Sequence, residues 1–242
     1  MNNDEPILFI EINEINFIFA AGVYNNDNLE VVEKITVPHI GIDKNKFIDI
    51  FKASETLKNN IKKIEDKLDC IFKDVTVILD NFDCTCINVS GFKKLNGSQV
   101  LKENISYILN SLKSAVSDNE KDKSILHIFN SRSILDGNNI ENLPIGLFGN
   151  FYSHELTFLL IGNNDLKNIK QIFNKNNLEV KKIILKKFCE GVKLINQNNI
   201  ETFYKIKINH DTCNIIFFDQ ASFKYSENFN FGTDIIFKDI KK

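Results

Sequence analysis

The sequence predicts an α/β protein with a mixed sheet, in which one β-β-β-α-β unit is complete and a second copy has only begun. A hairpin-like stretch near the start of the chain, FIEINEINFIFAAG, is matched near its end by YKIKINHDTCNIIFF. Each stretch is followed by a third strand-like run and then by a helix signal. Repetition of one supersecondary unit is a strong organising signal. We therefore expect two related lobes, with a region of different order between them.

The first unit occupies the first third of the chain. Residues 7–12 and 15–24 are β-rich and are separated by the polar pair Asn13-Glu14, so they predict a hairpin. From about residue 46 to 72, apolar residues recur every three or four positions, which is the period of an amphipathic helix. Two further strands complete the unit, and they are expected at 29–37 and 75–79.

Residues 84–162 predict a different order, β-α-β-β, which we interpret as a small α+β domain inserted into the first lobe. Its helix is expected to begin near Ser98, whose hydroxyl can cap it, and a charged loop is expected at Ser117 to Lys123. The first strand is expected to end at Gly91. The strands of this insert are placed at 84–90, 125–129 and 156–161.

The remaining segments return to the first lobe and then open the second. A helix at 165–175 and a strand at 178–185 resume the β-α-β rhythm, and a helix is expected to open near the end of the chain. The strands of the second lobe are expected at 203–208, 213–218 and 222–229. We therefore divide the chain into a first lobe (1–83 and 163–200), an insert (84–162) and an incomplete second lobe (201–242). Such a lobe leaves an open sheet edge and an uncovered apolar side, which predicts self-association or an unstable C-terminal segment.

Composition excludes several classes of protein. With 242 residues, 43% of them apolar, the chain can bury a real core. A formal net charge of −2 gives no basic surface, so nucleic acid is not expected as a partner. The five cysteines form no CxxC pair and follow no secretory signal, which is typical of a reducing cytoplasm. Charged and amide residues interrupt the longest apolar stretch, 7–24, so no membrane segment is expected.

A duplicated β-β-β-α-β unit whose two hairpin turns face one another resembles the actin-like (ribonuclease H-like) ATPase fold. Three stretches are similar, in order, to FtsA, a bacterial cell-division actin homologue. HIGIDKNKFID (39–49) resembles the segment before the family's first long helix, and FGTDIIFKDI (231–240) resembles the start of its second-lobe helix, with Gly232 and Asp239 at matching positions. The insert carries a D-G turn followed by P-x-G-x-x-G, matched by Asp136, Gly137, Pro144, Gly146 and Gly149.

The resemblance implies a role in bacterial cytokinesis. In the family, the insert (an SHS2-type domain) contacts the neighbouring subunit of a filament and later-acting division proteins. The expected partners are thus division proteins and a second copy, bound through the insert residues just named. The family's FtsZ-binding subdomain and membrane-binding helix have no counterpart before Lys242, so FtsZ is expected as a partner only if the chain continues further. The expected location is the cytoplasm, at the division site through partners on the inner face of the membrane.

The resemblance also identifies two phosphate turns, and both have lost their glycines. One family turn has the pattern D-x-G-G-G-T. In this chain Lys207 stands in place of the aspartate, Asn209, His210 and Asp211 stand in place of the three glycines, and Thr212 matches the threonine. The first turn, D/E-x-G-T in the family, reads Glu11-Ile12-Asn13-Glu14. Asparagine tolerates the left-handed conformation, so both hairpins should survive.

Acidic side chains in these turns disfavour a bound phosphate. One carboxylate at ~5 Å from a phosphate charge, in an effective dielectric of about 20, opposes binding by roughly 3 kcal/mol, more than a hundredfold in affinity. Glu14 and Asp211 carry such carboxylates, and side chains also block the close approach that glycine permits. We therefore expect a non-catalytic pseudo-ATPase that uses no ATP, Mg²⁺ or other metal.

Three alternatives stay open. His210 and Asp211 could join Glu11 or Glu14 in a metal site, although we interpret the turn as solvated. The chain could be an active ATPase or phosphotransferase of the actin-like superfamily with an altered phosphate turn, which would then use ATP and Mg²⁺. It could also be a pilus-assembly scaffold of the PilM kind.

Two pairs of lysines lie near the end of the strand expected at 178–185. We interpret them as solvated side chains. The alternative is that they bind phosphate or lipid. These residues are Lys181, Lys182, Lys186 and Lys187.

Overall fold

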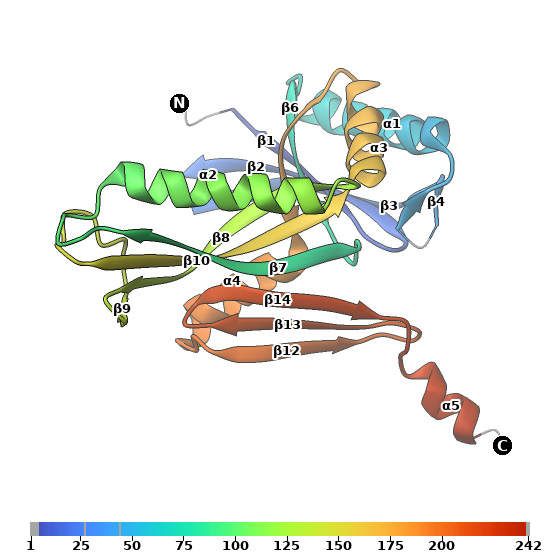
Figure 1. The fold of residues 1–242 in the computed structure, drawn as a ribbon. Coiled ribbons are helices and arrows are strands. Elements are labelled where there is room, and N and C mark those ends of the chain that lie inside the picture. Colours follow the sequence, from blue (N-terminus) through green and yellow to red (C-terminus); the bar gives the residue numbers. More distant parts are fainter. Residues whose placement is uncertain (1–4, 27, 44, 241–242) are drawn as a thin grey trace. The chain divides into compact units, whose positions relative to one another are not determined.

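The computed structural model describes residues 5–26, 28–43 and 45–240 (Figure 1). The chain forms two compact units. Unit 1 comprises Met1–Phe82 and Asn164–Glu190, and unit 2 comprises Asp83–Asn163 and Gly191–Lys242. Each unit has its own sheets and its own apolar core.

Unit 1 is built on a five-stranded mixed sheet with the order β11-β6-β1-β2-β3. The first three strands form an antiparallel meander, and β1 also pairs in parallel with β6, which pairs in parallel with β11. This confirms the predicted mixed β-β-β-α-β arrangement. The strands are β1 (Ile7–Ile12), β2 (Asn16–Asn25), β3 (Asn28–Pro38), β6 (Asp74–Leu79) and β11 (Glu179–Leu185).

Helices follow the strands of unit 1. Helix α1 (Ile50–Leu68) is shorter than predicted, because the Asp49 carboxylate caps its first turn by accepting a hydrogen bond from Lys52 N. At its other end the backbone of Asp69 turns left-handed. Two short strands, β4 (Ile42–Asp43) and β5 (Lys46–Phe47), precede α1.

Two more helices belong to this part of the chain. Helix α3 (Asn163–Asn174) lies close to its predicted range. Helix α4 (Lys186–Asn198), by contrast, was not predicted. It contains Gly191, a residue that weakens a helix signal in the sequence. In unit 2 a Cβ added at Gly191 would lie 2.2 Å from Phe218 Cε2, so close packing requires the glycine there.

Unit 2 contains two antiparallel sheets. The first has the order β7-β10-β8-β9 and is covered by helix α2, while the second has the order β12-β13-β14. Phe129 of the first sheet meets Phe223 of the second with ring centroids 5.3 Å apart, and Asn88 Nδ2 donates to Lys224 O at 2.9 Å. The elements are β7 (Cys84–Lys94), α2 (Lys102–Asn119), β8 (Lys123–Leu135), β9 (Asn138–Ile140), β10 (Phe151–Gly162), β12 (Phe203–Ile208), β13 (Cys213–Asp219), β14 (Ser222–Phe229) and α5 (Asp234–Ile240).

Three details of the insert differ from the sequence prediction. Strand β7 continues through Gly91, because the missing side chain makes room for Ile108 of α2; a Cβ would lie 2.7 Å from its Cγ2. Ser98 does not cap α2, since the cap residue is Leu101, whose N–H donates to Asn104 Oδ1 at 2.7 Å. The helix also extends to Asn119, into the stretch predicted as a charged loop.

The compact units divide the chain differently from the predicted lobes. Unit 2 combines the predicted insert (84–162) with the predicted second-lobe segment (201–242), and the boundary falls between Glu190 and Gly191 rather than at residue 200. Packing explains this grouping, because residues of α4 after Glu190 and the C-terminal strands share one core with the insert. The three-part division into lobes and insert stays a prediction.

A buried histidine in unit 2 makes its stability depend on pH. His154 on β10 is 2% exposed, and neither ring nitrogen has a hydrogen-bond partner among the described residues. Burial lowers the pKa of His154 below its ordinary value of 6.5. As the pH falls below about 6.5, the unfolded chain therefore takes up a proton before the folded chain does, and folding stability is lost.

We expect His154→Leu to flatten this acid loss of stability while the wild type declines from neutral pH downward. The measurement is urea unfolding of unit 2 across pH 5 to 8, the range in which a histidine ordinarily titrates. His210→Gln, in an exposed turn of the same unit, is the control and should keep the wild-type slope. Equal slopes in all three proteins would contradict the assignment to His154.

Candidate functional site: two closed hairpin turns and an internal cation

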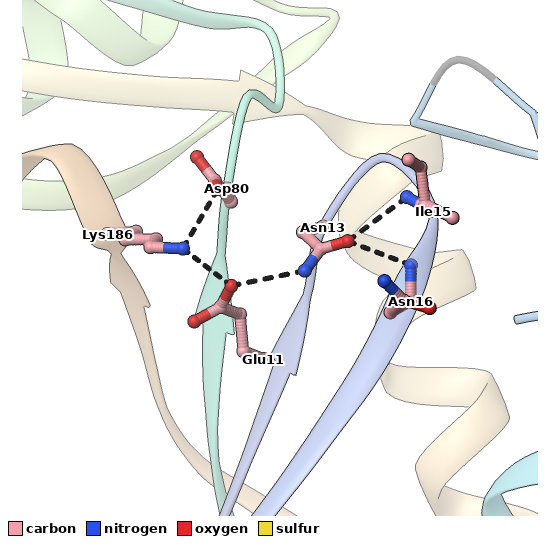
Figure 2. Close-up of polar contacts among 6 residues, drawn as sticks. All are labelled: Glu11, Asn13, Ile15, Asn16, Asp80 and Lys186. Carbon is pink, nitrogen blue, oxygen red and sulfur yellow. Dashed lines mark hydrogen bonds and ion pairs between the residues drawn. The ribbon is translucent and has the colours of Figure 1, made fainter. Parts of the chain in front are cut away.

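The first predicted phosphate turn joins β1 to β2 and closes on its own side chain (Figure 2). Asn13 Oδ1 accepts hydrogen bonds from the backbone N–H groups of Ile15 (3.0 Å) and Asn16 (2.8 Å). The backbone N–H of Asn13 donates to Asn16 O at 3.1 Å. The backbone N–H groups of Asn13, Ile15 and Asn16 are therefore already satisfied within the turn.

His39, which follows β3, closes the other side of this turn. Its backbone N–H donates to Ile15 O at 3.0 Å, and its Nε2 lies 3.0 Å from Asn13 O. The imidazole also packs edge-on against Phe17, with centroids 5.6 Å apart. The carbonyl oxygens of the turn are thus occupied as well.

An ion cluster lies beside the turn, at the carboxyl ends of three adjacent parallel strands. Lys186 Nζ is 2.7 Å from Glu11 Oε1 and 3.1 Å from Asp80 Oδ2 (Figure 2). Glu11 is on β1, Asp80 directly follows β6, and Lys186 directly follows β11. Asn13 Nδ2 donates to the same Glu11 oxygen at 3.3 Å, which joins the cluster to the turn.

The cluster is only partly accessible to water. The side chains of Glu11 and Asp80 are 15% and 12% exposed, and that of Lys186 is 31% exposed. Burial acts to lower the pKa of Lys186, but hydrogen bonding and attraction to Glu11 and Asp80 together outweigh it, so the pKa is raised. The ammonium is therefore firmly charged at neutral pH.

The second predicted phosphate turn, in unit 2, is closed in a parallel way. Asn209 N donates to Thr212 O at 2.8 Å, and Asn209 Nδ2 donates to Thr212 Oγ1 at 3.0 Å. The segment after β14 covers the carbonyls, because Thr233 N donates to Asn209 O (3.0 Å) and Asp234 N donates to His210 O (2.8 Å). Gly232 permits this approach, since a Cβ there would lie 2.3 Å from Asn209 O.

The two turns share one design that the residue types alone did not reveal. Each has four residues beginning with asparagine, and in each the segment after the third strand donates to the turn carbonyls. Both hairpins are present, as predicted, although neither Asn13 nor Asn209 has a positive φ. Each asparagine instead uses its amide side chain to close the turn.

The remaining predicted turn residues lie mostly on the surface. Glu14, His210 and Asp211 are exposed, and Lys207 on β12 stands opposite Asn214 in the sheet register. Among residues 5–26, 28–43 and 45–240, no three His, Cys, Asp or Glu side chains gather as a metal site would require.

Sequence reasoning missed Asp80 and Lys186. The interpretation of Lys186 as solvated is wrong, because it is held by two carboxylates; Lys187 beside it is buried. A signal was present, since carboxyl ends of neighbouring parallel strands meet at one edge of a sheet. If this rule is applied to the strands predicted at 75–79 and 178–185, it predicts that Asp80 and Lys186 lie close together.

The predicted interaction residues of the insert lie in the turn between β8 and β9 and in the segment between β9 and β10. Asp136 and Gly137 form a tight turn with φ of 49° and 85°, and the Asp136 carboxylate accepts from Asn150 N and Phe151 N at 2.9 and 2.7 Å. Pro144 is buried, and a Cβ at Gly149 would lie 2.5 Å from Leu135 Cδ1. Gly146, with φ of 87°, has open space around it.

Large apolar side chains on and around these segments are exposed, and sequence reasoning did not single them out. The rings of Phe92 and Phe151 stack at 5.1 Å, and Phe148 forms a bridge with Gln99. We call the following set the insert patch: Phe92 (61% exposed), Leu101 (50%), Leu147 (48%), Phe148 (70%) and Phe151 (39%). Large exposed apolar side chains of this kind can contribute to protein-binding surfaces.

We compared the chain with known proteins by sequence and by fold. No protein-family model matches the chain. One chain of a PilM–PilN type IV pilus biogenesis complex has the same fold, with a TM-score of 0.64 at 8% identity, over 96% of this chain and 63% of that one. The fold is therefore that of the actin-like ATPases, with a mixed sheet and flanking helices.

Curated sequences specify the likeness further. The cell division protein FtsA of Buchnera aphidicola (subsp. Acyrthosiphon pisum) is 23% identical over 236 residues, which is 97% of this chain and 56% of that protein. FtsA of Borreliella burgdorferi is 23% identical over 225 residues, 91% of this chain and 54% of that protein. The chain is thus an FtsA-like protein of actin-like fold, and it spans about half the length of these relatives.

Helix length and polarity bear on the relation to membranes. Within the part of the chain that the structure describes, no helix combines the length and apolar character needed to cross a bilayer.

Proposed function

We propose that this chain acts as a nucleotide-independent scaffold of the bacterial division machinery, binding proteins through the insert. The observation that carries the first half is the closure of both hairpin turns. A phosphate entering the first turn would have to displace the Asn13 amide oxygen from two N–H groups. It would also approach Glu11 and Asp80, which share a single ammonium.

The charge of the ion cluster supports the same proposal. The carboxylates of Glu11 and Asp80 lie beside the turn, where they oppose the approach of the polyphosphate of ATP. A Mg²⁺ ion would have to replace the Lys186 ammonium to reach both carboxylates. We therefore propose that ATP and Mg²⁺ are not cofactors of this chain and that it is not an enzyme.

The insert patch supports the second half of the proposal. Aromatic side chains on a rigid loop are the residue type that dominates protein interfaces. The glycine and proline residues predicted from the sequence hold this loop in shape, so they contribute to binding by positioning Leu147 and Phe148. By similarity to relatives named cell division proteins, the proposed partners are division proteins and a second copy of the chain, at the division site.

We expect Phe148→Asp to weaken self-association at least about tenfold, because a charge replaces a large apolar side chain that is 70% exposed. Analytical ultracentrifugation over a concentration series measures the dissociation constant. Val31→Asp, at an exposed apolar position of unit 1, is the matched control and should leave it unchanged.

A fluorescent fusion tests the cellular role with the same two variants. The wild-type fusion and Val31→Asp should gather at the division site in the host, and Phe148→Asp should be dispersed. Dispersal of all three fusions, or division-site localisation of all three, would contradict binding through the insert patch.

A further inference from the structure

Unit 2 contains a cleft of about 440 Å³ between its two antiparallel sheets. Strands β7, β8 and β10 line it from the first sheet, and strands β13 and β14 line it from the second. Pockets that hold small molecules span roughly 300–1,000 Å³ and combine an apolar wall with a few fixed polar groups. The cleft shares no residue with the ion cluster, the two hairpin turns or the insert patch, so the proposed scaffold role does not account for it.

Hydrogen bonds between side chains hold one wall of the cleft in place. Thr157 Oγ1 donates to Asn88 Oδ1 at 2.6 Å, and Ser131 Oγ lies 2.7 Å from Thr157 Oγ1. Asn88 Nδ2 in turn donates to the backbone oxygen of Lys224 at 2.9 Å. These contacts join three strands of the first sheet to β14. The wall is therefore preorganised, and a ligand that enters the cleft does not have to order it.

The charged side chains of the cleft make few hydrogen bonds within the described part of the chain. Lys224 Nζ can donate three but donates one there, to Ser131 O at 3.3 Å. The Glu155 carboxylate pairs with Arg132, but the 3.9 Å to Arg132 Nε is too long for a hydrogen bond. Arg132 Nε is itself buried and has no hydrogen-bond partner among the described residues. Because buried polar groups are normally bonded, this set of side chains indicates a partner from outside the chain.

The charges and the apolar wall together define the class of ligand. Lys224 brings a cation to the cleft, whereas Glu155 and Asp219 bring carboxylates. A ligand with a single charge would meet a group of its own sign there without a counter-charge to offset the repulsion. The apolar wall is aromatic, because Phe217 and Tyr225 stand opposite one another in the β13–β14 register. The cleft therefore matches a ligand that carries both charges and an aromatic ring.

We propose that this cleft binds a free aromatic amino acid. The carboxylate of the ligand meets Lys224 and its ammonium meets Glu155, while its ring packs against Phe217 and Tyr225. Burial lowers the pKa of Lys224 below its ordinary 10.5, and the attraction of Glu155 and Asp219 offsets this only in part. A bound carboxylate supplies further attraction for the ammonium. The proposal is independent of the scaffold role and of nucleotide binding.

An NMR titration of the full chain with L-phenylalanine tests the proposal. Amide signals of β10 and β14 should shift saturably, with a dissociation constant below about 1 mM. Two analogues that each lack one charge, hydrocinnamate and phenethylamine, should bind at least about tenfold more weakly. The absence of a saturable shift up to about 10 mM phenylalanine would overturn the proposal. Binding of either analogue as tightly as phenylalanine would overturn it as well.

Substitutions assign the two charged contacts. Glu155→Gln should weaken binding of phenylalanine at least about tenfold but should not weaken binding of hydrocinnamate, which has no ammonium. Lys224→Met should weaken binding of both ligands, and Lys113→Met, at an exposed position on α2, is the control that should weaken neither. An equal loss for both ligands in Glu155→Gln would reduce Glu155 to a structural role and overturn the assignment. Wild-type affinity for phenylalanine in that variant would do the same.

Discussion

Replacing Lys186 with Met is expected to lower the free energy of unfolding of unit 1 by about 2 kcal/mol, because it removes a partly buried ammonium that contacts two carboxylates. Lys186 Nζ lies within 3.1 Å of oxygens of both Glu11 and Asp80. Removing one partner of a fully buried pair costs about 3–5 kcal/mol, and partial exposure of this ammonium reduces the figure.

Hydrogen exchange of the β1 and β6 amides under mild denaturant measures this loss, since it reports on unit 1 alone. Lys181→Met is the matched control, because Lys181 on β11 pairs with Glu179 and Asp74 at an exposed position. That variant should leave the stability nearly unchanged, because the pair is exposed to solvent. Equal effects of the two substitutions would show that the cluster at Lys186 is no stronger than a surface ion pair.

The same variant has a defined pH signature. The folded-state pKa of Lys186 is raised above its ordinary 10.5, so its stabilising effect is fully present below about pH 10.5 and is lost as the pH rises through the higher folded-state value. The difference in stability between wild type and Lys186→Met should therefore shrink as the pH rises through that value.

Gly232→Ala should destabilise unit 2 by about 2 kcal/mol, since the added methyl has no free space and its neighbours are backbone atoms. The new Cβ would lie 2.3 Å from Asn209 O and 2.5 Å from His210 O. To relieve the contact, the segment must move away and lose the hydrogen bonds from Thr233 N and Asp234 N.

Gly97→Ala is the control for this prediction. Gly97 is in the same unit at φ of 82°, but a Cβ there meets nothing within 4 Å, so only the backbone conformation is strained, at about 1 kcal/mol. Urea unfolding with hydrogen exchange at β12 and β13 compares the two variants. A smaller loss for Gly232→Ala than for Gly97→Ala would contradict close packing at the second turn.

The periodicity of the sequence was enough to predict most of the fold. Alternation at 7–24 and the three-or-four-residue repeat within 46–72 both correspond to real elements, since these patterns follow directly from burial on one face. The repeat of the hairpin also located both turns. Helix α4 escaped prediction because Gly191 interrupts its helical signal for a packing reason, contact with Phe218, that lies far away in sequence.

The chemistry of the site was less accessible from the sequence. Loss of the turn glycines was visible, but the role of Asn13 was not, because the direction of a side-chain amide depends on the finished turn. Lys186 stands 175 residues from Glu11 and 106 from Asp80, so only the strand order brings them together. The insert patch was missed because exposure of Phe148 is decided by the loop and not by local composition.

Isothermal titration calorimetry with ATP and Mg²⁺ tests nucleotide independence most directly. The closed turns and the ammonium-filled carboxylate pair lead us to expect no saturable heat with ATP up to about 1 mM. An active actin-like ATPase titrated in the same buffer verifies that binding would be seen. A dissociation constant below about 100 μM, with Mg²⁺ required, would contradict the proposal and favour the ATPase alternative.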